Sequence, residues 1–180
     1  MATHLAFLRA VNVGGTGKIA MAELRTWLAA LGFAEVQTLL QSGNLVFRGG
    51  ARAGADLERF LEEKARANLG LDTEFFVRNP AEWADVIARN PFPEAAHDDP
   101  SHLLVVVLKA APMPPQVRAL QAAIRGREVV GARGRELYAV YPDGIGTSKL
   151  TLPLIEKHLA TRGTGRNWNT VLKMAALAKR

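Results

Sequence analysis

Four short segments hold most of the serine and asparagine side chains of this sequence, which are residues that could bind a ligand. The segments are residues 9–19 (RAVNVGGTGKI), 41–44 (QSGN), 147–150 (TSKL) and 164–170 (TGRNWNT). Serine, threonine and asparagine are poor residues for helix interiors, but they are favourable in turns, helix caps and ligand contacts. Their clustering therefore predicts either a set of structural corners or one binding site.

The first segment combines a glycine-rich turn with two cations. Backbone amides in a turn before a helix can bind an anion, and Gly14 and Gly15 provide such a turn beside the amide of Asn12. Arg9 and Lys18 would add positive charge on either side of it. The segment is not a phosphate-binding loop of the P-loop type, because that pattern requires glycine where Asn12 stands. The alternative is that the glycines only allow a tight connection between a strand and a helix.

Segment 164–170 is the strongest candidate for function. Arg166 offers a planar guanidinium suited to a phosphate or a carboxylate, and Asn167 and Asn169 offer amides. The helix expected to follow begins with unpaired backbone donors, where an anion could dock. In the alternative interpretation, Asn167 caps that helix and Trp168 anchors it in the core. The two interpretations are compatible.

The other two segments contribute hydroxyl, amide and ammonium groups. Ser148 places a hydroxyl beside the ammonium of Lys149, but adjacent residues of an extended chain point in opposite directions, so a Ser/Lys catalytic pair is not expected. A turn before a helix is the favoured interpretation of this segment. Gln41, Ser42 and Asn44 surround a predicted hairpin turn and complete the predicted ligand-binding set.

Other catalytic or metal-binding chemistry is sparse. The chain contains no cysteine, which excludes disulfides and thiol nucleophiles. His97, Asp98, Asp99 and His102 resemble a metal-binding cluster, but their acidic, proline-containing context favours a solvated turn. No Ser/His/Asp arrangement has a recognisable spacing. The sequence therefore predicts no metal and no cofactor, and it assigns no catalytic residue.

The positive charge of the chain is concentrated near its C-terminus. The chain has 180 residues and a net charge of +6, and residues 145–180 alone carry seven basic side chains against one acidic side chain. Such an excess can attract phosphate or nucleic acid, although basic residues also favour helix C-termini and solvated tails. No apolar run approaches the roughly 20 residues that span a bilayer, and no secretory signal precedes the first strand. We therefore expect a cytoplasmic protein without a membrane partner.

Hydrophobic periodicity predicts a β-α-β-β-α-β order in the first half. Alternating apolar residues indicate strands, apolar residues three and four apart indicate helices, and Gly32 and Gly70 mark the ends of two helices. The expected elements are a strand at 4–9, a helix at 21–31, strands at 36–41 and 44–48, a helix at 56–69 and a strand at 72–77. This is the order of a ferredoxin-like unit.

The second half repeats much of this series about 92 to 98 residues later, which suggests a duplicated unit. We expect a bridging helix at 80–89, an irregular stretch at 90–101, a strand at 102–109, a helix at 115–124, strands at 128–131 and 136–141, and a helix at 151–159. The last strand of the repeat is missing, and a helix starting near Trp168 takes its place. The predicted fold is α+β with mainly antiparallel sheets: a ferredoxin-like half at 1–79, a bridge at 80–101, and a second half with a C-terminal helix at 102–180.

The four segments, taken together, resemble a bacterial family catalogued as domain of unknown function 1697. The resemblance also involves Met21, Leu24, Leu31, Gly32, Asn90, Pro91 and Phe92. It runs from Leu5 to about Leu177, and it implies two ferredoxin-like halves and no established activity. The sequence departs from the family pattern at Ala10, where glycine is common, and at Met174, where leucine is common. Neither departure removes a polar group.

Three functions follow as hypotheses. In the leading one, the four segments gather into a basic pocket for a phosphate-bearing or other anionic small molecule, with Arg9, Lys18, Lys149 and Arg166 as charge partners. The second is a nucleic-acid binder that uses the basic C-terminal region, with an aromatic residue of the strand at 72–77 exposed for stacking. The third is an enzyme acting on a small anionic metabolite, with Lys18 or Lys149 as an acid or base. The oligomeric state does not follow from the sequence.

Overall fold

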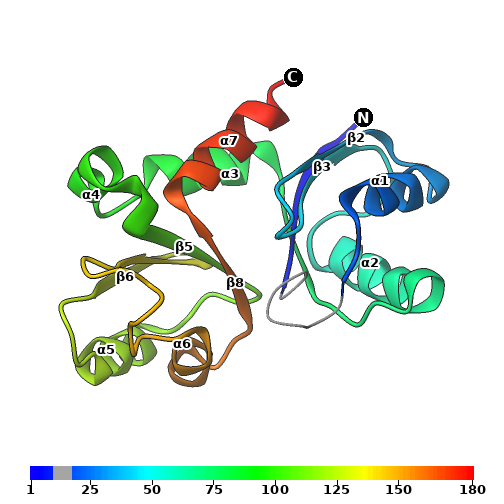
Figure 1. Ribbon diagram of the computed structural model, residues 1–180. Helices are drawn as coiled ribbons and strands as arrows, with labels where there is room; N and C mark the ends of the chain where they lie inside the picture. Colours follow the sequence, from blue (N-terminus) through cyan, green and yellow to red (C-terminus); the bar gives the residue numbers. More distant parts are fainter. Residues whose placement is uncertain (10–17) are drawn as a thin grey trace. The chain divides into compact units, whose positions relative to one another are not determined.

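The computed structural model describes residues 1–9 and 18–180 as two compact units (Figure 1). The first unit contains residues 1–84 and 173–180, and the second contains residues 85–172. The predicted ligand residues Asn12, Gly14 and Gly15 lie outside the described residues. The α+β fold class is confirmed, because each unit contains helices and a four-stranded antiparallel sheet. Among the described helices, none is long and apolar enough to cross a membrane.

The first unit has the β-α-β-β-α-β order that its hydrophobic pattern predicts. Its elements are β1 (Thr3–Leu8), α1 (Met21–Ala30), β2 (Ala34–Leu39), β3 (Asn44–Arg48), α2 (Gly54–Leu69) and β4 (Phe75–Arg78). The sheet order is β2-β3-β1-β4, with every neighbouring pair antiparallel. Helix α2 ends at Gly70, whose φ of 61° is the left-handed conformation that glycine adopts without a steric penalty.

Helices α1 and α2 cover one face of this sheet (Figure 1). Leu24 and Leu28 of α1 and Leu57 and Leu61 of α2 are fully buried in the core that they form with the sheet. Trp27 also lies in this core, at 6% exposure, as expected from its position on the apolar side of α1. Apolar residues three or four positions apart thus place one side of each helix against the sheet.

The second unit repeats this arrangement after a helical connection. The connection contains α3 (Pro80–Ala88), α4 (Pro93–Asp98) and the short 3-10 helix η1 (Pro100–His102). The repeated elements are β5 (Leu103–Leu108), α5 (Pro114–Ala123), β6 (Val129–Arg133), β7 (Glu136–Val140), α6 (Leu152–Leu159) and β8 (Gly163–Asn167), and α7 (Trp168–Ala178) follows them. The sheet order is β6-β7-β5-β8, again antiparallel, with α5 and α6 beside each other (Figure 1).

Two expectations for the second half were wrong. The last strand of the repeat is present as β8, which pairs with β5. Its glycines weaken the strand signal in the sequence, but the fold requires Gly163, because a Cβ there would lie 2.8 Å from Val106 Cγ1 and 2.9 Å from Leu108 Cδ2. The stretch 90–101 is also not irregular, since α4 begins with Pro93, a residue that fits the first turn of a helix.

The two sheets correspond residue by residue at their last strands. Arg78 of β4 pairs with Leu5 of β1, and Arg166 of β8 pairs with Val105 of β5. Both arginines are buried, at 1% and 7% exposure. The last strand of each unit therefore carries a buried arginine at the equivalent register position.

A glutamate of the preceding helix protects each of these edge strands. The carboxylate of Glu62 in α2 accepts the backbone N–H of Phe75 at 2.8 Å, and Glu156 in α6 accepts that of Gly163 at 2.9 Å. Unpaired backbone groups on an edge strand favour pairing with a strand of another chain. An N–H that is bonded to the glutamate is no longer available for such pairing.

Both tyrosines of the chain are buried in the second unit and should ionise only at strongly alkaline pH. The Tyr138 hydroxyl donates to the Val86 carbonyl at 2.6 Å, and the Tyr141 hydroxyl donates to the Leu150 carbonyl at 2.9 Å. Burial, followed by the negative charge of Glu128, raises the pKa of Tyr141 from 10.0 to about 12. Burial, followed by the charge of Glu136, also raises the pKa of Tyr138.

These shifts predict a loss of stability above pH 10. Because the unfolded chain releases tyrosine protons first, the free energy of unfolding should fall as the pH rises from 10 through the folded-state pKa of Tyr141, about 12. In an ultraviolet pH titration of tyrosinate absorbance, Tyr141 should therefore ionise near pH 12 and Tyr138 at still higher pH in the folded protein, whereas both should ionise near pH 10 in urea. Ionisation near pH 10 with the fold intact, as monitored by circular dichroism, would contradict the burial of these hydroxyls.

Candidate functional site

Two predicted cations flank the part of segment 9–19 that the structure does not describe. Arg9 directly follows β1, and its backbone N–H donates to the Glu74 carbonyl at 3.0 Å. Its carbonyl accepts a hydrogen bond from the Thr73 hydroxyl at 2.7 Å, and its guanidinium lies 3.9 Å from the Glu74 carboxylate. Lys18 is exposed. Arg9 is thus engaged with the loop before β4, and Lys18 faces solvent.

Segment 41–44 forms the turn between β2 and β3. The Asn44 side chain is fully buried and donates to the Leu39 carbonyl at 2.8 Å and to the Ser42 hydroxyl at 3.0 Å. Gly43 has a φ of 84°, and a Cβ there would lie 2.9 Å from Leu8 Cβ. Gln41 is exposed at the same turn. These contacts of Ser42 and Asn44 stabilise the predicted hairpin.

Arg166 lies inside the second unit, on β8. Its guanidinium donates to the Thr164 hydroxyl and to the Gly165 carbonyl, both at 2.8 Å. Burial lowers the pKa of Arg166 to about 10, so the side chain remains charged at neutral pH. A buried charge that is held by its own strand acts first as a structural group.

The helix cap predicted in segment 164–170 is present. The side-chain oxygen Oδ1 of Asn167 accepts the backbone N–H of Thr170 at 3.0 Å, which is the contact of a helix N-cap. Trp168, at 5% exposure, is the first residue of α7 and is buried. Asn167 and Asn169 are exposed. This segment therefore combines a structural cap with two amides at the surface.

Ser148 and Lys149 lie in a turn before α6, as the sequence predicts. The Ser148 hydroxyl donates to Glu128 Oε1 at 2.8 Å and accepts the backbone N–H of Leu150 at 3.0 Å. Lys149 is exposed, whereas Leu150 is buried at 3% exposure. Thr151 then caps α6 by accepting the N–H of Leu154 at 3.4 Å. The turn thus fixes the Ser148 hydroxyl next to an exposed ammonium.

Ser148 and Lys149 line a cavity of about 260 Å³, which we call the loop pocket. It is lined by Arg125, Gly126, Glu128, Asp143, Gly144, Thr147, Ser148 and Lys149. The sheet register explains why residues from two loops meet here. Val129, the first residue of β6, pairs with Val140, the last of β7, so the chain before β6 and the chain after β7 emerge at the same end of the sheet.

The charges of the loop pocket leave two cations available. The Asp143 carboxylate binds the guanidinium of Arg127, and this contact holds the pKa of Asp143 below its usual value. Glu128 accepts the Ser148 hydroxyl. Arg125 and Lys149 make no ion pair with any residue that the structure describes. Asp143 thus has an ion-pair partner and Glu128 has a hydrogen-bond partner. The two cations line the pocket beside Thr147 and Ser148.

Sequence reasoning found only part of this pocket. Ser148 and Lys149 were predicted site residues, whereas Arg125 and Thr147 were not. The arginine is recognisable only once β6 and β7 are paired, because it lies more than 20 residues before the other lining cation. Of the other described candidates in this unit, Arg166, Asn167 and Asn169 do not line the loop pocket.

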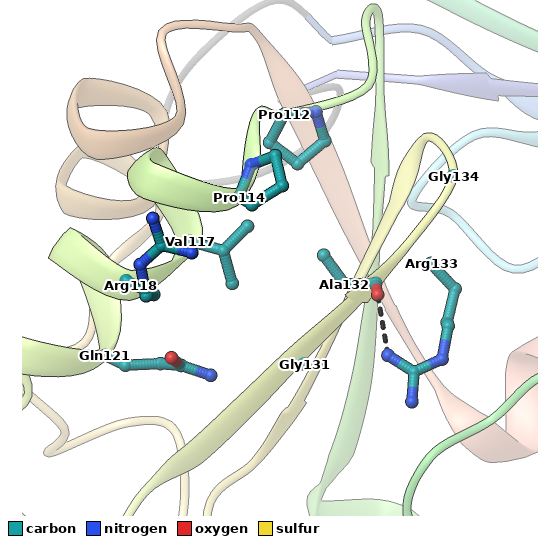
Figure 2. A pocket seen from close by; sticks show the side chains of 9 residues that line it. All are labelled: Pro112, Pro114, Val117, Arg118, Gln121, Gly131, Ala132, Arg133 and Gly134. Atoms are coloured by element: carbon teal, nitrogen blue, oxygen red, sulfur yellow. Dashed lines mark hydrogen bonds between the residues drawn. The ribbon is translucent and has the colours of Figure 1, made fainter.

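A second cavity of the same unit lies between α5 and the β6–β7 hairpin (Figure 2). Its volume is about 330 Å³, and it is lined by Pro112, Pro114, Val117, Arg118, Gln121, Gly131, Ala132, Arg133 and Gly134. Val117 and Gln121 point from α5 toward the hairpin, while Arg118 and Arg133 lie at opposite sides of the view (Figure 2). Gln121 donates to the Val130 carbonyl at 3.1 Å, and Arg133 donates to the Ala132 carbonyl at 2.8 Å. None of the predicted site residues that the structure describes lines this cavity.

The histidine and aspartate residues near α4 form two separate pairs. His97 Nδ1 lies 2.7 Å from Asp98 Oδ1, and His102 Nδ1 lies 2.8 Å from Asp99 Oδ2. Over residues 1–9 and 18–180, no three His, Asp or Glu side chains are grouped as metal ligands would be. This cluster therefore gives no basis for assigning a metal.

Comparison with known proteins extends over almost the whole chain. The structure is similar to the solved structure of conserved bacterial protein SP0830 from Streptococcus pneumoniae, with a TM-score of 0.75 and 20% sequence identity. The similarity covers 98% of this chain and 98% of that chain, and at this identity it concerns the fold. No curated protein matches the sequence. The family model described as "Protein of unknown function (DUF1697)" matches residues 1–138. The chain therefore belongs to the DUF1697 family of proteins of unknown function.

Proposed function

We propose that this protein binds a small molecule carrying a phosphate or another anionic group, and that the loop pocket is its binding site. One observation carries the proposal: Arg125 and Lys149 line one concave site with the hydroxyls of Thr147 and Ser148, and neither cation is paired with a described residue. Guanidinium and ammonium groups and the Thr147 hydroxyl can donate hydrogen bonds to phosphate or carboxylate oxygens, whereas the single proton of the Ser148 hydroxyl is donated to Glu128. An anion between Arg125 and Lys149 would give both cations a partner of opposite charge.

The residues that contact the ligand in this proposal are not the ones that the sequence suggested. Arg166 donates to its own strand, and Asn44 stabilises a hairpin turn, so their described contacts are structural. Ser148 and Lys149 remain at the proposed site, where Lys149 supplies an ammonium for the ligand and Ser148 fixes the turn beside it. The proposed site thus retains segment 147–150, of which Thr147 is a new ligand residue, and adds Arg125.

The nucleic-acid alternative has less support. Phe75 and Phe76, the aromatic residues considered for base stacking, are both fully buried. Of the seven cations at 145–180, Arg166 is buried, and the others are divided between the two units. For the enzyme alternative, the Ser148 hydroxyl is held in a turn by Glu128 and Leu150, and we assign no reaction to it.

The proposal also treats the two units as copies of one ferredoxin-like unit. Their sheets share one strand order, β2-β3-β1-β4 and β6-β7-β5-β8. Arg78 and Arg166 occupy equivalent register positions, and Glu62 and Glu156 contact equivalent edge-strand amides. These repeated details support a duplication, although the proposed ligand site uses the second copy alone.

A thermal-shift screen tests the proposed function. Inorganic phosphate, sugar phosphates, nucleotides and dicarboxylates are added to the full chain, to Arg125→Ala and to Arg118→Ala. A ligand at 100 times its Kd stabilises a protein by about 2.7 kcal/mol, which corresponds to a rise in Tm of roughly 5–10 °C for a chain of this size. We expect this rise in the wild type and in Arg118→Ala, and a much smaller rise in Arg125→Ala.

The two variants form a matched pair. Each removes one exposed arginine from the second unit, but Arg125 lines the loop pocket and Arg118 lines the cavity between α5 and the hairpin. A shift that is lost in Arg118→Ala and retained in Arg125→Ala would move the site to the other cavity. No shift with any of these anions would refute the proposed function.

A further inference from the structure

A third cavity adjoins the loop pocket and shares both of its cations. Its volume is about 500 Å³, and it is lined by Ala122, Ala123, Ile124, Arg125, Lys149, Leu150 and Leu154. Because Arg125 and Lys149 line both cavities, the two cations stand at their common border. We call this third cavity the apolar pocket.

The two adjoining cavities differ in chemistry. Apart from Arg125 and Lys149, every residue that lines the apolar pocket has an aliphatic side chain. These residues come from the end of α5, the start of α6 and the loop before α6. Ile124, Leu150 and Leu154 also pack against the hydrophobic core of the unit, so the wall of the pocket is anchored. The loop pocket, in contrast, is lined by hydroxyls, charges and glycines.

From this arrangement we infer that the natural ligand is an amphipathic anion, with a phosphate or carboxylate head and an aliphatic or aromatic body. The inference rests on the proposed function and adds the class of ligand to it. The head binds between Arg125 and Lys149, next to Thr147 and Ser148, and the body occupies the apolar pocket. A phosphate without a body would leave the aliphatic wall in contact with water.

The apolar area that the ligand buries determines how much its affinity should rise as its body lengthens. Each methylene group removed from water stabilises a complex enough to tighten binding by roughly fourfold. A ligand series with a constant phosphate head and a growing body should therefore show a steep rise in affinity until the apolar pocket is filled. The two cations at the border keep the head in place while the body lengthens.

The test compares inorganic phosphate with methyl, butyl, hexyl and phenyl phosphate by isothermal titration calorimetry on the full chain. In the wild type, hexyl phosphate should bind at least 30-fold more tightly than methyl phosphate, which allows for incomplete burial of the added methylenes. Ala122→Phe places a ring in the apolar pocket and should reduce this gain to less than fivefold, while the affinity for inorganic phosphate is retained.

Ala119→Phe is the matched control for the filled pocket. Ala119 is also an exposed residue of α5, one turn before Ala122, and it does not line the apolar pocket. The control should show the same rise in affinity with the length of the alkyl phosphate as the wild type. Circular dichroism and the Tm of each variant establish that the fold is intact, and Ala122→Leu provides a smaller filling side chain if the phenylalanine variant fails to fold.

The outcomes separate this inference from the proposed function. If inorganic phosphate binds but longer bodies add no affinity, the amphipathic ligand is refuted and the anion site stands. If affinity rises equally in Ala122→Phe and in the wild type, the body lies elsewhere and the inference fails. If no member of the series binds, both proposals fail.

A final arm distinguishes a free ligand from a lipid headgroup. Sedimentation with phosphatidylcholine vesicles, with and without phosphatidic acid, should leave the protein in the supernatant in both cases, because the inferred ligand is a free molecule that enters the pocket. Sedimentation that requires phosphatidic acid and is lost in Ala122→Phe would overturn the free-ligand assignment.

Discussion

Replacing Arg166 with alanine is expected to lower the free energy of unfolding by about 3 kcal/mol without weakening ligand binding to the folded protein. The guanidinium is 7% exposed and donates to the Thr164 hydroxyl and the Gly165 carbonyl. Alanine would leave both acceptors without this donor and create a cavity beside β8. Removing a buried charge offsets part of the loss, because burial already disfavours that charge. Urea unfolding monitored by circular dichroism measures the difference.

Two further variants identify the origin of this effect. Arg166→Met keeps most of the side-chain volume, so it should cost less, about 1 kcal/mol. Lys157→Ala removes an exposed cation from α6 of the same unit and should change stability by less than about 0.5 kcal/mol. An Arg166→Ala protein with wild-type stability and no ligand binding would restore the initial hypothesis that Arg166 holds the anion.

Removing both cations of the loop pocket is expected to weaken ligand binding by more than 100-fold. Hydrogen bonds from a charged donor contribute about 1.5–3 kcal/mol each, so Arg125→Ala and Lys149→Ala should each lower affinity at least tenfold. The fold should persist, because both side chains are exposed and unpaired among the described residues. Calorimetric titration with the best ligand of the thermal-shift screen measures both single variants and the double variant.

The control for this loss carries the same change in net charge. Arg118→Ala combined with Arg133→Ala removes two exposed cations from the cavity between α5 and the hairpin. This double variant should bind within about twofold of the wild type, because screening by salt weakens the attraction of distant surface charges. Equal losses in both double variants would mean that general positive charge, and not the loop pocket, attracts the ligand.

Much of the fold follows from the sequence because the hydrophobic pattern has a clear period. The apolar spacing of α1 and α2, the alternation expected in β1 and the hairpin turn expected before β3 placed these elements close to their observed bounds. Strand β8 was missed because Gly163 and Gly165 carry no side chain to mark an apolar face. Their need for small size arises from Val106 and Leu104 on the neighbouring strand, and that proximity is visible only in the folded sheet.

The candidate site was harder to predict, because polar residues do not reveal their partners in a sequence. Arg166 and Lys149 both look like ligand cations in the sequence. Arg166, however, is buried and donates to residues of its own strand, whereas Lys149 is exposed and lines a pocket. Arg125 was missed because its relation to Lys149 depends on the pairing of Val129 with Val140. The pairing of strands in the folded protein therefore determines which cations lie together at a pocket.

The most direct test of the loop pocket is a titration followed by two-dimensional proton–nitrogen NMR on the full chain. Adding the best-binding anion should shift the backbone amide signals of Gly126, Gly144, Thr147 and Ser148, which line the pocket. The signals of Val117 and Gly131, in the cavity between α5 and the hairpin, should stay in place. Shifts confined to that other cavity, or spread over the basic surface without saturating, would contradict an anion site in the loop pocket.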